Sequence, residues 1–187
     1  MNVFDFDKTI YKRDSTADFY FYTLVRHPII LIELPITAFY FLRWKLGGCS
    51  KTKFKEAMYR FLGHIDDPEA LAEKFWEDRS GDIKNWYLKM KKPDDLIISA
   101  SPEFLLRPIC RKLGVRLIAS RVAPKTGHYT GLNCWGGEKV RRLKIEYPGF
   151  HINKFYSDSH SDEPLACLAR KAFIVKGDKI KDWNFKK

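Results

Sequence analysis

The chain of 187 residues is poor in cysteine, and its four cysteines show no paired spacing. Cys49, Cys110, Cys134 and Cys167 lie far apart in the sequence. Zinc ribbons and disulfide frameworks both need cysteines at short, repeated spacings, so the pattern argues against either. Scattered thiols are typical of a reducing compartment, and we therefore predict a cytoplasmic protein.

Internal repeats, low-complexity linkers and long hydrophobic segments are also missing. An apolar stretch covers residues 28–42, but it contains Glu33 and Pro35 and is too short to span a bilayer comfortably. No secretory signal is expected, because a buried strand is predicted to begin at residue 2. The hydrophobic content of 45% is sufficient for one packed domain with room for an insertion.

Acidic residues are fewer than basic ones, 23 against 34, which gives a formal net charge of +11. A charge of this size favours anionic partners, namely phosphorylated small molecules, an acidic membrane face or nucleic acid. The charge does not choose among them, and the motifs described below make nucleic acid the least expected of the three.

The apolar stretch of residues 28–42 has two interpretations. It is either a buried helix of an inserted cap or a surface helix that rests on an anionic membrane. The second interpretation is suggested by the basic residues Arg26, Arg43 and Lys45 that flank the stretch. It would make the protein peripheral at the inner membrane face.

Strands and helices alternate after residue 94, which predicts an α/β fold with a doubly wound, mostly parallel sheet. Residues 14–92 look helical throughout, with a helix start at Asp67 and Pro68 and a break near Gly81. We therefore predict a core of residues 1–13 and 93–187 with a helical cap, residues 14–92, inserted after the first strand. The predicted core strands are residues 2–6, 96–99, 115–119, 153–157 and 172–175. The predicted core helices are residues 103–114, 138–146 and 163–170, and residues 121–134 are predicted to form a hairpin.

Polar residues follow three of these strands, at the point where each strand ends. Asp5 and Asp7 lie at and just after the end of the first strand, Ser99 lies at the end of the second, and Asp158 directly follows the fourth. Ligands of open α/β sheets bind beyond the carboxyl ends of the strands. A buried carboxylate there needs a cationic partner or a metal, since an unpaired buried charge costs several kcal/mol.

Four motifs in order along the chain resemble those of the haloacid dehalogenase-like superfamily, and within it the phosphoserine-phosphatase-like branch. They are Asp5-x-Asp7-x-Thr9, then Ser99, then Lys139, and last the stretch from Asp158 to Asp162. Each motif alone arises easily by chance, but four in this order at predicted element boundaries are a strong signal. The resemblance covers the whole chain, including the helical insertion.

Within that branch the chain is similar in pattern to phosphatidylglycerophosphatase C, a group of lipid-phosphate phosphatases. The similar stretches are Arg26-His27-Pro28 with the apolar run after it, residues 137–143, and residues 156–159 through Pro164-Leu165.

The resemblance implies that Asp5 is a nucleophile that forms an aspartyl-phosphate. It implies that Asp7 is the general acid for the leaving group and then the base that activates water. Thr9 would orient Asp7 by a hydrogen bond and belongs to the substrate-binding set. Because Asp7 is present, hydrolysis of a phosphate ester is favoured over cleavage of a carbon–halogen bond.

The same resemblance places Ser99, with Ala100 beside it, against the phosphoryl oxygens. Ser101 competes with Ser99 for this role. Lys139 would neutralise the charge shared by the nucleophile and the phosphoryl group. Lys125 is the alternative lysine, since it lies in a loop after a strand.

A Mg²⁺ ion is the implied cofactor. Its ligands would be the carboxylates of Asp5 and Asp158 and the main-chain carbonyl of Asp7, which are the oxygen donors that Mg²⁺ prefers. Asp162 would hold either a metal-bound water or Lys139.

Asp14 has two interpretations of equal weight. It matches an acidic residue that contacts substrate in the phosphoserine phosphatases, but the shorter Asp side chain beside Arg13 puts an amino-acid substrate in doubt. It is equally suited to be the N-cap of the first helix of the cap.

The sequence thus predicts a Mg²⁺-dependent phosphomonoester hydrolase. Its substrate would be a lipid-linked phosphate such as phosphatidylglycerophosphate, or a small soluble phosphate ester. The alternative is a non-catalytic basic protein that binds anionic membrane or nucleic acid and retains the acidic residues as a structural metal site. The presence of Asp7 argues against this alternative, because a structural metal site does not need the second carboxylate.

Overall fold

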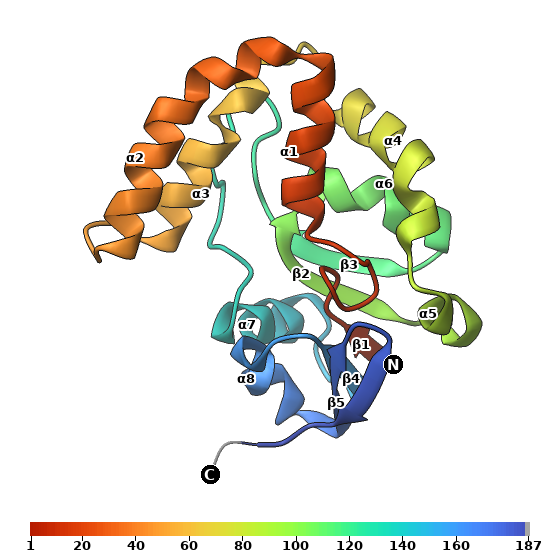
Figure 1. Cartoon of the computed structure of the whole chain (residues 1–187). Coiled ribbons are helices and arrows are strands. Elements are labelled where there is room, and N and C mark those ends of the chain that lie inside the picture. The colour runs from red at the N-terminus through yellow and green to blue at the C-terminus, as the bar shows by residue number, and fades with distance from the viewer. Residues whose placement is uncertain (186–187) are drawn as a thin grey trace.

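Six strands form one sheet in the order β3-β2-β1-β4-β5-β6, seen in the lower half of Figure 1. This computed structural model describes residues 1–185. The first five strands are parallel to their neighbours, and only β6 runs antiparallel, against β5. The predicted α/β fold with a mostly parallel sheet is confirmed. The strands are β1 Asn2–Phe4, β2 Leu96–Pro102, β3 Arg116–Ser120, β4 Ile152–Ser157, β5 Ala169–Lys176 and β6 Lys179–Asp182.

Several predicted core segments differ from the structure: the first strand ends at Phe4, the second continues to Pro102, and β6 was not predicted. The helix predicted over residues 163–170 ends at Ala166, because Ala169 already pairs with Ile152 of β4 and begins β5. Residues 121–134 form no regular hairpin, and one isolated bridge joins Val122 to Tyr129. The core helices are α6 Glu103–Leu113, α7 Gly137–Glu146 and α8 Glu163–Ala166.

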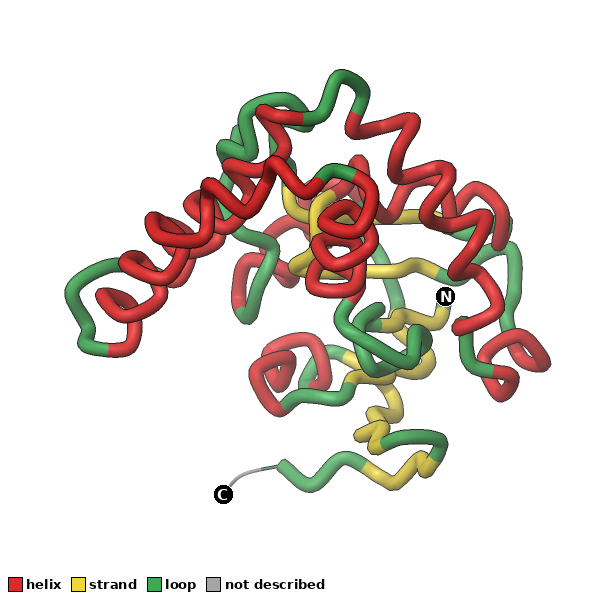
Figure 2. The backbone as a smooth tube through the Cα atoms, turned by 45° about the horizontal axis from the view of Figure 1, so that its top comes forward, coloured by secondary structure: helices red, strands yellow, loops and turns green. Residues whose placement is uncertain are grey.

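The predicted helical character of residues 14–92 is confirmed. Asp67 caps the helix that starts at Pro68, accepting hydrogen bonds from the N–H groups of Glu69 and Ala70. Gly81 lies in a short 3₁₀ turn that separates this helix from the next. These elements are α1 Ser15–Arg26, η1 Pro28–Glu33, α2 Leu34–Lys45, α3 Lys51–Tyr59, η2 Arg60–His64, α4 Pro68–Arg79, η3 Ser80–Asp82 and α5 Asn85–Met90. Figure 2 shows that α2 and α3 form a hairpin projecting to one side of the molecule.

Alternating side chains on the central strands divide the core into two layers. Phe4 of β1 and Ile97 of β2 join a cluster on the face covered by α1, α4 and α6. Val3 and Ile98, the alternating neighbours on the same strands, join a second cluster on the face covered by α7 and α8. Helices from the inserted segment therefore share a hydrophobic core with the sheet. The boundaries of the cap remain a prediction.

The segment between β3 and α7 runs close to α3 and ties the helical hairpin to the sheet. The N–H of Tyr129 donates to the carboxylate of Glu56 at 3.0 Å. Gly127 lies so close to Tyr59 that a Cβ atom built on it would stand 2.5 Å from the Tyr59 carbonyl oxygen. The φ angle of Gly127 is +72°, a region that L side chains rarely adopt.

We expect Gly127→Ala to lower the free energy of unfolding by roughly 1–3 kcal/mol, because it adds both a backbone strain and a steric overlap. Urea denaturation followed by circular dichroism measures the change. Gly131→Ala in the same segment is the matched control, since its added Cβ meets nothing within 4 Å. Equal stability of the two variants would contradict the close packing of this segment on α3.

Candidate active site

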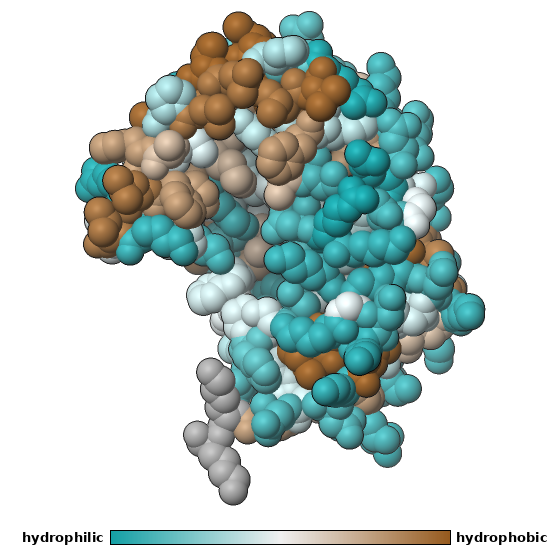
Figure 3. All heavy atoms as spheres, in the orientation of Figure 1, coloured by the Kyte–Doolittle hydropathy of each residue, from teal (hydrophilic) through white to brown (hydrophobic). Residues whose placement is uncertain are grey.

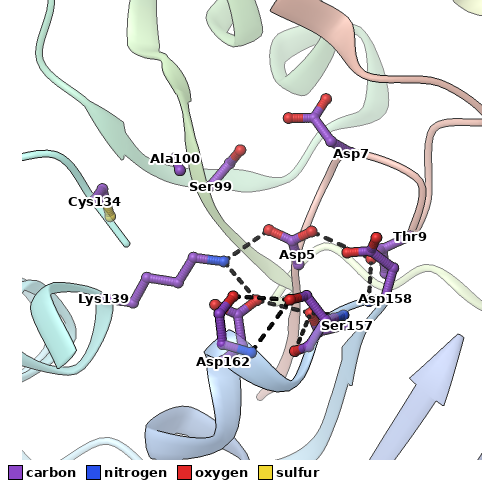
Figure 4. Close-up of polar contacts among 12 residues, drawn as sticks. Asp5, Asp7, Thr9, Ser99, Ala100, Cys134, Lys139, Ser157, Asp158 and Asp162 are labelled. Carbon is purple, nitrogen blue, oxygen red and sulfur yellow. Dashed lines mark hydrogen bonds and ion pairs between the residues drawn. The ribbon is translucent and has the colours of Figure 1, made fainter. Parts of the chain in front are cut away.

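The site is built at the carboxyl edge of the three central strands. Asp5 directly follows β1, and its N–H is held by the carbonyl of Tyr156 on β4 at 2.9 Å. Asp158 follows the end of β4, and Ser99 lies on the neighbouring β2. Figure 4 shows these groups coming together from separate strands. The expectation that the predicted polar residues meet at one edge of the sheet agrees with their positions in the structure.

A buried lysine joins two of the predicted carboxylates. Lys139 enters the site from α7, and only 2% of its surface is exposed. Its ammonium group contacts Oδ1 of Asp5 at 2.7 Å and Oδ2 of Asp162 at 2.8 Å. Burial alone would lower the pKa of Lys139. The two carboxylates raise this pKa by more than burial lowers it, so the net shift is upward. The lysine is thus a fixed positive charge in the site.

Asp162 is positioned to hold Lys139. The Ser157 hydroxyl at the end of β4 donates to its Oδ2 at 2.7 Å. Both Ser157 and Asp162 are buried. Lys139, one of the two partners expected for Asp162 from the sequence, contacts its carboxylate at 2.8 Å.

Thr9 contacts Asp5 and not Asp7, which corrects the predicted hydrogen bond. Its hydroxyl donates to Oδ2 of Asp5 at 3.2 Å and accepts from the N–H of Asp158 at 2.9 Å. The chain reverses between Asp7 and Thr9, where Lys8 has a φ of +57°. Thr9 therefore ties the nucleophile candidate to the loop that follows β4.

Asp7 is held instead by two serines that come from different elements. It accepts from the N–H of Ser15, at the start of α1, at 2.7 Å and from the hydroxyl of Ser101 at 2.5 Å. Burial and the charge of Asp14 raise the pKa of Asp7 to about 6, against the opposing effect of these hydrogen bonds. A carboxyl group with a pKa of about 6 binds a proton more readily near neutral pH than an ordinary aspartate does, which suits it to both donating and accepting a proton in catalysis. Sequence reasoning missed Ser15 in this role, because its position reads as part of a helix cap.

The structure separates the two serine candidates of β2. The Ser99 side chain is fully buried and accepts a hydrogen bond from the N–H of Ser101 at 3.1 Å. Ala100 and Ser101 line the cleft, while Ser99 does not. A shift in register between Ser99 and Pro102 interrupts the pairing of β2 with β3 at this point. Ser101, the competitor in the sequence analysis, thus has the more accessible position.

Both interpretations of Asp14 agree with its position. It caps α1, accepting from the N–H of Ala17 at 3.0 Å, and it also lines the cleft. Lys125, the alternative to Lys139, is exposed and does not line the cleft.

The candidate residues surround a cleft of about 350 Å³ between the sheet edge and α3. Its far wall is formed by residues that the sequence analysis did not select, because their contribution depends on how the helical hairpin folds back. Lys55 donates to the carbonyl of Ala100 at 3.1 Å, and the ammonium of Lys51 lies 5.5 Å from the centre of the Trp135 ring. The remaining residues of this wall are Phe54 and Met58.

A divalent cation fits the acidic side of the cleft. Asp5, Asp7 and Asp158 all line it, and among residues 1–185 no group donates a hydrogen bond to the Asp158 carboxylate. Burial raises the pKa of Asp158, although the positive charge of Lys176 opposes this shift. Within the described residues no three His, Cys, Asp or Glu side chains gather as a metal cluster. The donor set would therefore consist of two carboxylates and one main-chain carbonyl, the oxygen ligands that Mg²⁺ prefers.

The acid pair lies at the carboxyl end of a central strand, which is where open α/β sheets bind their ligands. The family model described as haloacid dehalogenase-like hydrolase matches residues 3–166, and the chain belongs to this family. No curated protein matches the chain.

Solved structures share this fold at low sequence identity. A protein of unknown function from Bordetella pertussis Tohama I is 22% identical, with a TM-score of 0.70, over 92% of this chain and 87% of that one. A phosphoserine phosphohydrolase-like protein from Francisella tularensis is 16% identical, with a TM-score of 0.57, over 92% and 86%. A substrate-bound phosphoserine phosphatase is 17% identical, with a TM-score of 0.52, over 91% and 82%.

We expect Lys139→Met to lower the free energy of unfolding by about 3–5 kcal/mol, because it leaves two buried carboxylates without their cation. Urea denaturation in the presence of a chelator measures the loss. Lys144→Met is the control, since Lys144 lies on the same helix but is exposed. A difference between the two variants below about 1 kcal/mol would show that the buried ion pairs add little to the fold.

Proposed function

We propose that the protein is a Mg²⁺-dependent phosphomonoester hydrolase that works through an aspartyl-phosphate intermediate. The observation that carries this proposal is the fixed carboxylate of Asp5. One of its oxygens is held by Lys139 and the other by Thr9, and the group lines a cleft that also contains Asp7. A nucleophile aimed in this way, with a second carboxyl group two residues on, is suited to two-step phosphoryl transfer.

In the first step a carboxylate oxygen of Asp5 bonds to phosphorus, and the bond between phosphorus and the leaving oxygen breaks. Asp7 transfers its proton to that oxygen, so the leaving group departs as an alcohol. In the second step Asp7, now ionised, takes a proton from water while the water oxygen attacks phosphorus. The bond to Asp5 breaks, inorganic phosphate leaves and both carboxyl groups return to their starting states.

The other residues supply charge and orientation. Lys139 balances the negative charge of Asp5, which would otherwise repel an anionic phosphoryl group. Ser15 and Ser101 hold the Asp7 carboxyl group in the cleft. A Mg²⁺ ion held by Asp5, Asp158 and the Asp7 carbonyl would neutralise the phosphoryl oxygens.

The proposed substrate is a phosphate monoester, either lipid-linked, such as phosphatidylglycerophosphate, or small and soluble. Lys51 and Lys55 line the cleft and favour an anionic molecule. All four cysteines are free, which supports a reducing compartment such as the cytoplasm. The positioning of Asp7 by two separate serines favours an enzyme over a structural metal site.

We expect Asp5→Asn to lower kcat/KM for an aryl phosphate at least about 1000-fold, because the amide is a poor nucleophile. Phosphate release with Mg²⁺ and with a chelator measures both the loss and the need for the metal. Asp66→Asn, an exposed residue of the cap, should leave the rate unchanged. Full activity in Asp5→Asn would refute the proposed mechanism.

We expect Asp7→Asn to accumulate a phosphorylated enzyme when the substrate is an aryl phosphate. Its leaving group departs without a proton, so the first step continues, while the second step lacks its base. Mass spectrometry of acid-quenched protein detects the adduct, and the peptide that contains Asp5 should carry it. The double variant Asp5→Asn with Asp7→Asn is the control and should carry none. Absence of the adduct from Asp7→Asn, with hydrolysis continuing, would exclude the assigned role of Asp7.

A further inference from the structure

The helical hairpin exposes an unusual amount of apolar surface. No residue of α2 is buried, although large hydrophobic side chains make up much of the helix. Figure 3 shows this surface as the brown area over the upper left of the molecule. We refer to the exposed hydrophobic residues of η1, α2 and the turn after it as the apolar cap surface. They are Ile29, Leu31, Ile32, Leu34, Phe39, Phe41, Leu42 and Leu46.

Three of these residues form a continuous stripe. Phe39, Leu42 and Leu46 follow one another at spacings of three and four residues, so they lie on one face of the helix. Their exposed fractions are 52%, 58% and 77%. Contiguous apolar surface of this kind marks a site that another molecule or a membrane covers.

Basic groups outnumber acidic ones around this surface. Residues 34–55 contain Arg43, Lys45, Lys51, Lys53 and Lys55 but no aspartate or glutamate. The acidic residues on either side of this range already have partners. Glu33 is buried and paired with Arg60 and His64, and Glu56 accepts a hydrogen bond from the N–H of Tyr129.

Two of the basic side chains lie over aromatic rings of the hairpin. The Arg43 guanidinium is 5.9 Å from the centre of the Phe39 ring, and the Lys45 ammonium is 4.8 Å from that of Trp44. Apolar, aromatic and cationic groups are therefore interleaved on one surface, as in helices that lie at a membrane interface.

We propose that the apolar cap surface docks in the plane of an anionic phospholipid bilayer. The apolar stripe would enter the boundary between headgroups and acyl chains, and Arg43 and Lys45 would contact lipid phosphates. A second copy of the chain is the poorer occupant, because a symmetric contact would bring the same cationic groups against each other. The helix lies on the membrane and does not cross it, since no helix within residues 1–185 is long and apolar enough for a span.

Docking would also orient the cleft. The same hairpin that carries the apolar cap surface supplies Lys51, Phe54, Lys55 and Met58 to the cleft wall. The docked protein would therefore hold its cleft next to the lipid headgroups. This second consequence rests on the proposed function, whereas the docking itself does not.

Vesicle flotation tests the docking directly. The full chain is mixed with vesicles of phosphatidylcholine alone or with about one third phosphatidylglycerol, at low and at high sodium chloride concentration. We expect flotation with the anionic vesicles, weakened by salt, and much less with the neutral ones. Failure to float with anionic vesicles at low salt would overturn the proposal.

Two double variants test whether vesicle binding depends on the apolar cap surface or on exposed hydrophobic residues in general. Phe39→Glu with Leu42→Glu should lower binding to anionic vesicles at least about tenfold, because it removes buried apolar area and adds repulsive charge. Leu132→Glu with Ile145→Glu is the matched control, since both residues are exposed hydrophobics outside the hairpin. Equal losses in the two double variants would overturn the assignment of the surface.

Folding and catalysis are followed separately. Circular dichroism and thermal unfolding show that the variants retain the fold, and aryl phosphate hydrolysis reports on the catalytic proposal alone. Neither Phe39 nor Leu42 lines the cleft, so hydrolysis of the soluble ester should be unchanged.

Sedimentation without vesicles tests whether a second copy of the chain covers the apolar cap surface. If the wild type is a dimer that Phe39→Glu with Leu42→Glu converts to a monomer, the surface is a protein interface and the docking proposal is wrong.

Discussion

The contact of one buried ammonium group with two carboxylates is the constraint on which the site depends. Lys139 lies between Asp5 and Asp162, at 2.7 and 2.8 Å, and almost none of its surface is exposed. Without the lysine, two negative charges would be buried side by side at a cost of several kcal/mol. The site therefore needs α7 in place against the sheet. Leu143 of α7 packs in the core, and this packing both stabilises the fold and holds Lys139 in position.

The parallel sheet explains why a few residues are enough to build the site. β1 contains only three residues, yet it pairs with β2 on one side and β4 on the other. The carboxyl ends of these strands bring Asp5, Asp158 and the Ser99–Ser101 segment to a common edge. The helical hairpin then closes the opposite side of the cleft with basic and aromatic groups, so the fold separates the acidic reaction chemistry from a cationic wall.

Much of this arrangement was predictable from the sequence, since strand ends and helix caps are encoded locally. Asp5 and Asp158 were selected because they lie at the ends of predicted strands, and Lys139 was selected because of the resemblance to a known family. The partners of Asp7 were not, because Ser15 and Ser101 meet it only through the tertiary fold. The contact of Thr9 with Asp5 was missed because it depends on the chain reversal at Lys8. Lys8 has a positive φ angle, which a lysine side chain does not favour and which the sequence therefore did not indicate.

The sequence could not decide whether residues 28–42 are buried or exposed, since hydrophobicity alone favours both. β6 was overlooked for the opposite reason, because the exposed residues Lys179–Asp182 lack a hydrophobic pattern and pair only through their backbone.

The position of β1 between β2 and β4 has a consequence for synthesis of the protein. The ribosome makes β1 first, but the second strand that pairs with it is more than 140 residues away, as the contact of Asn2 with Lys154 shows. The emerging chain must keep this short apolar segment unpaired on one side until β4 has been made. Because such distant pairings form slowly and leave strand edges unpaired, the nascent chain is exposed to aggregation during this interval. A chaperone that shields β1 during that interval would be of more use to this chain than to one whose central strand is made last.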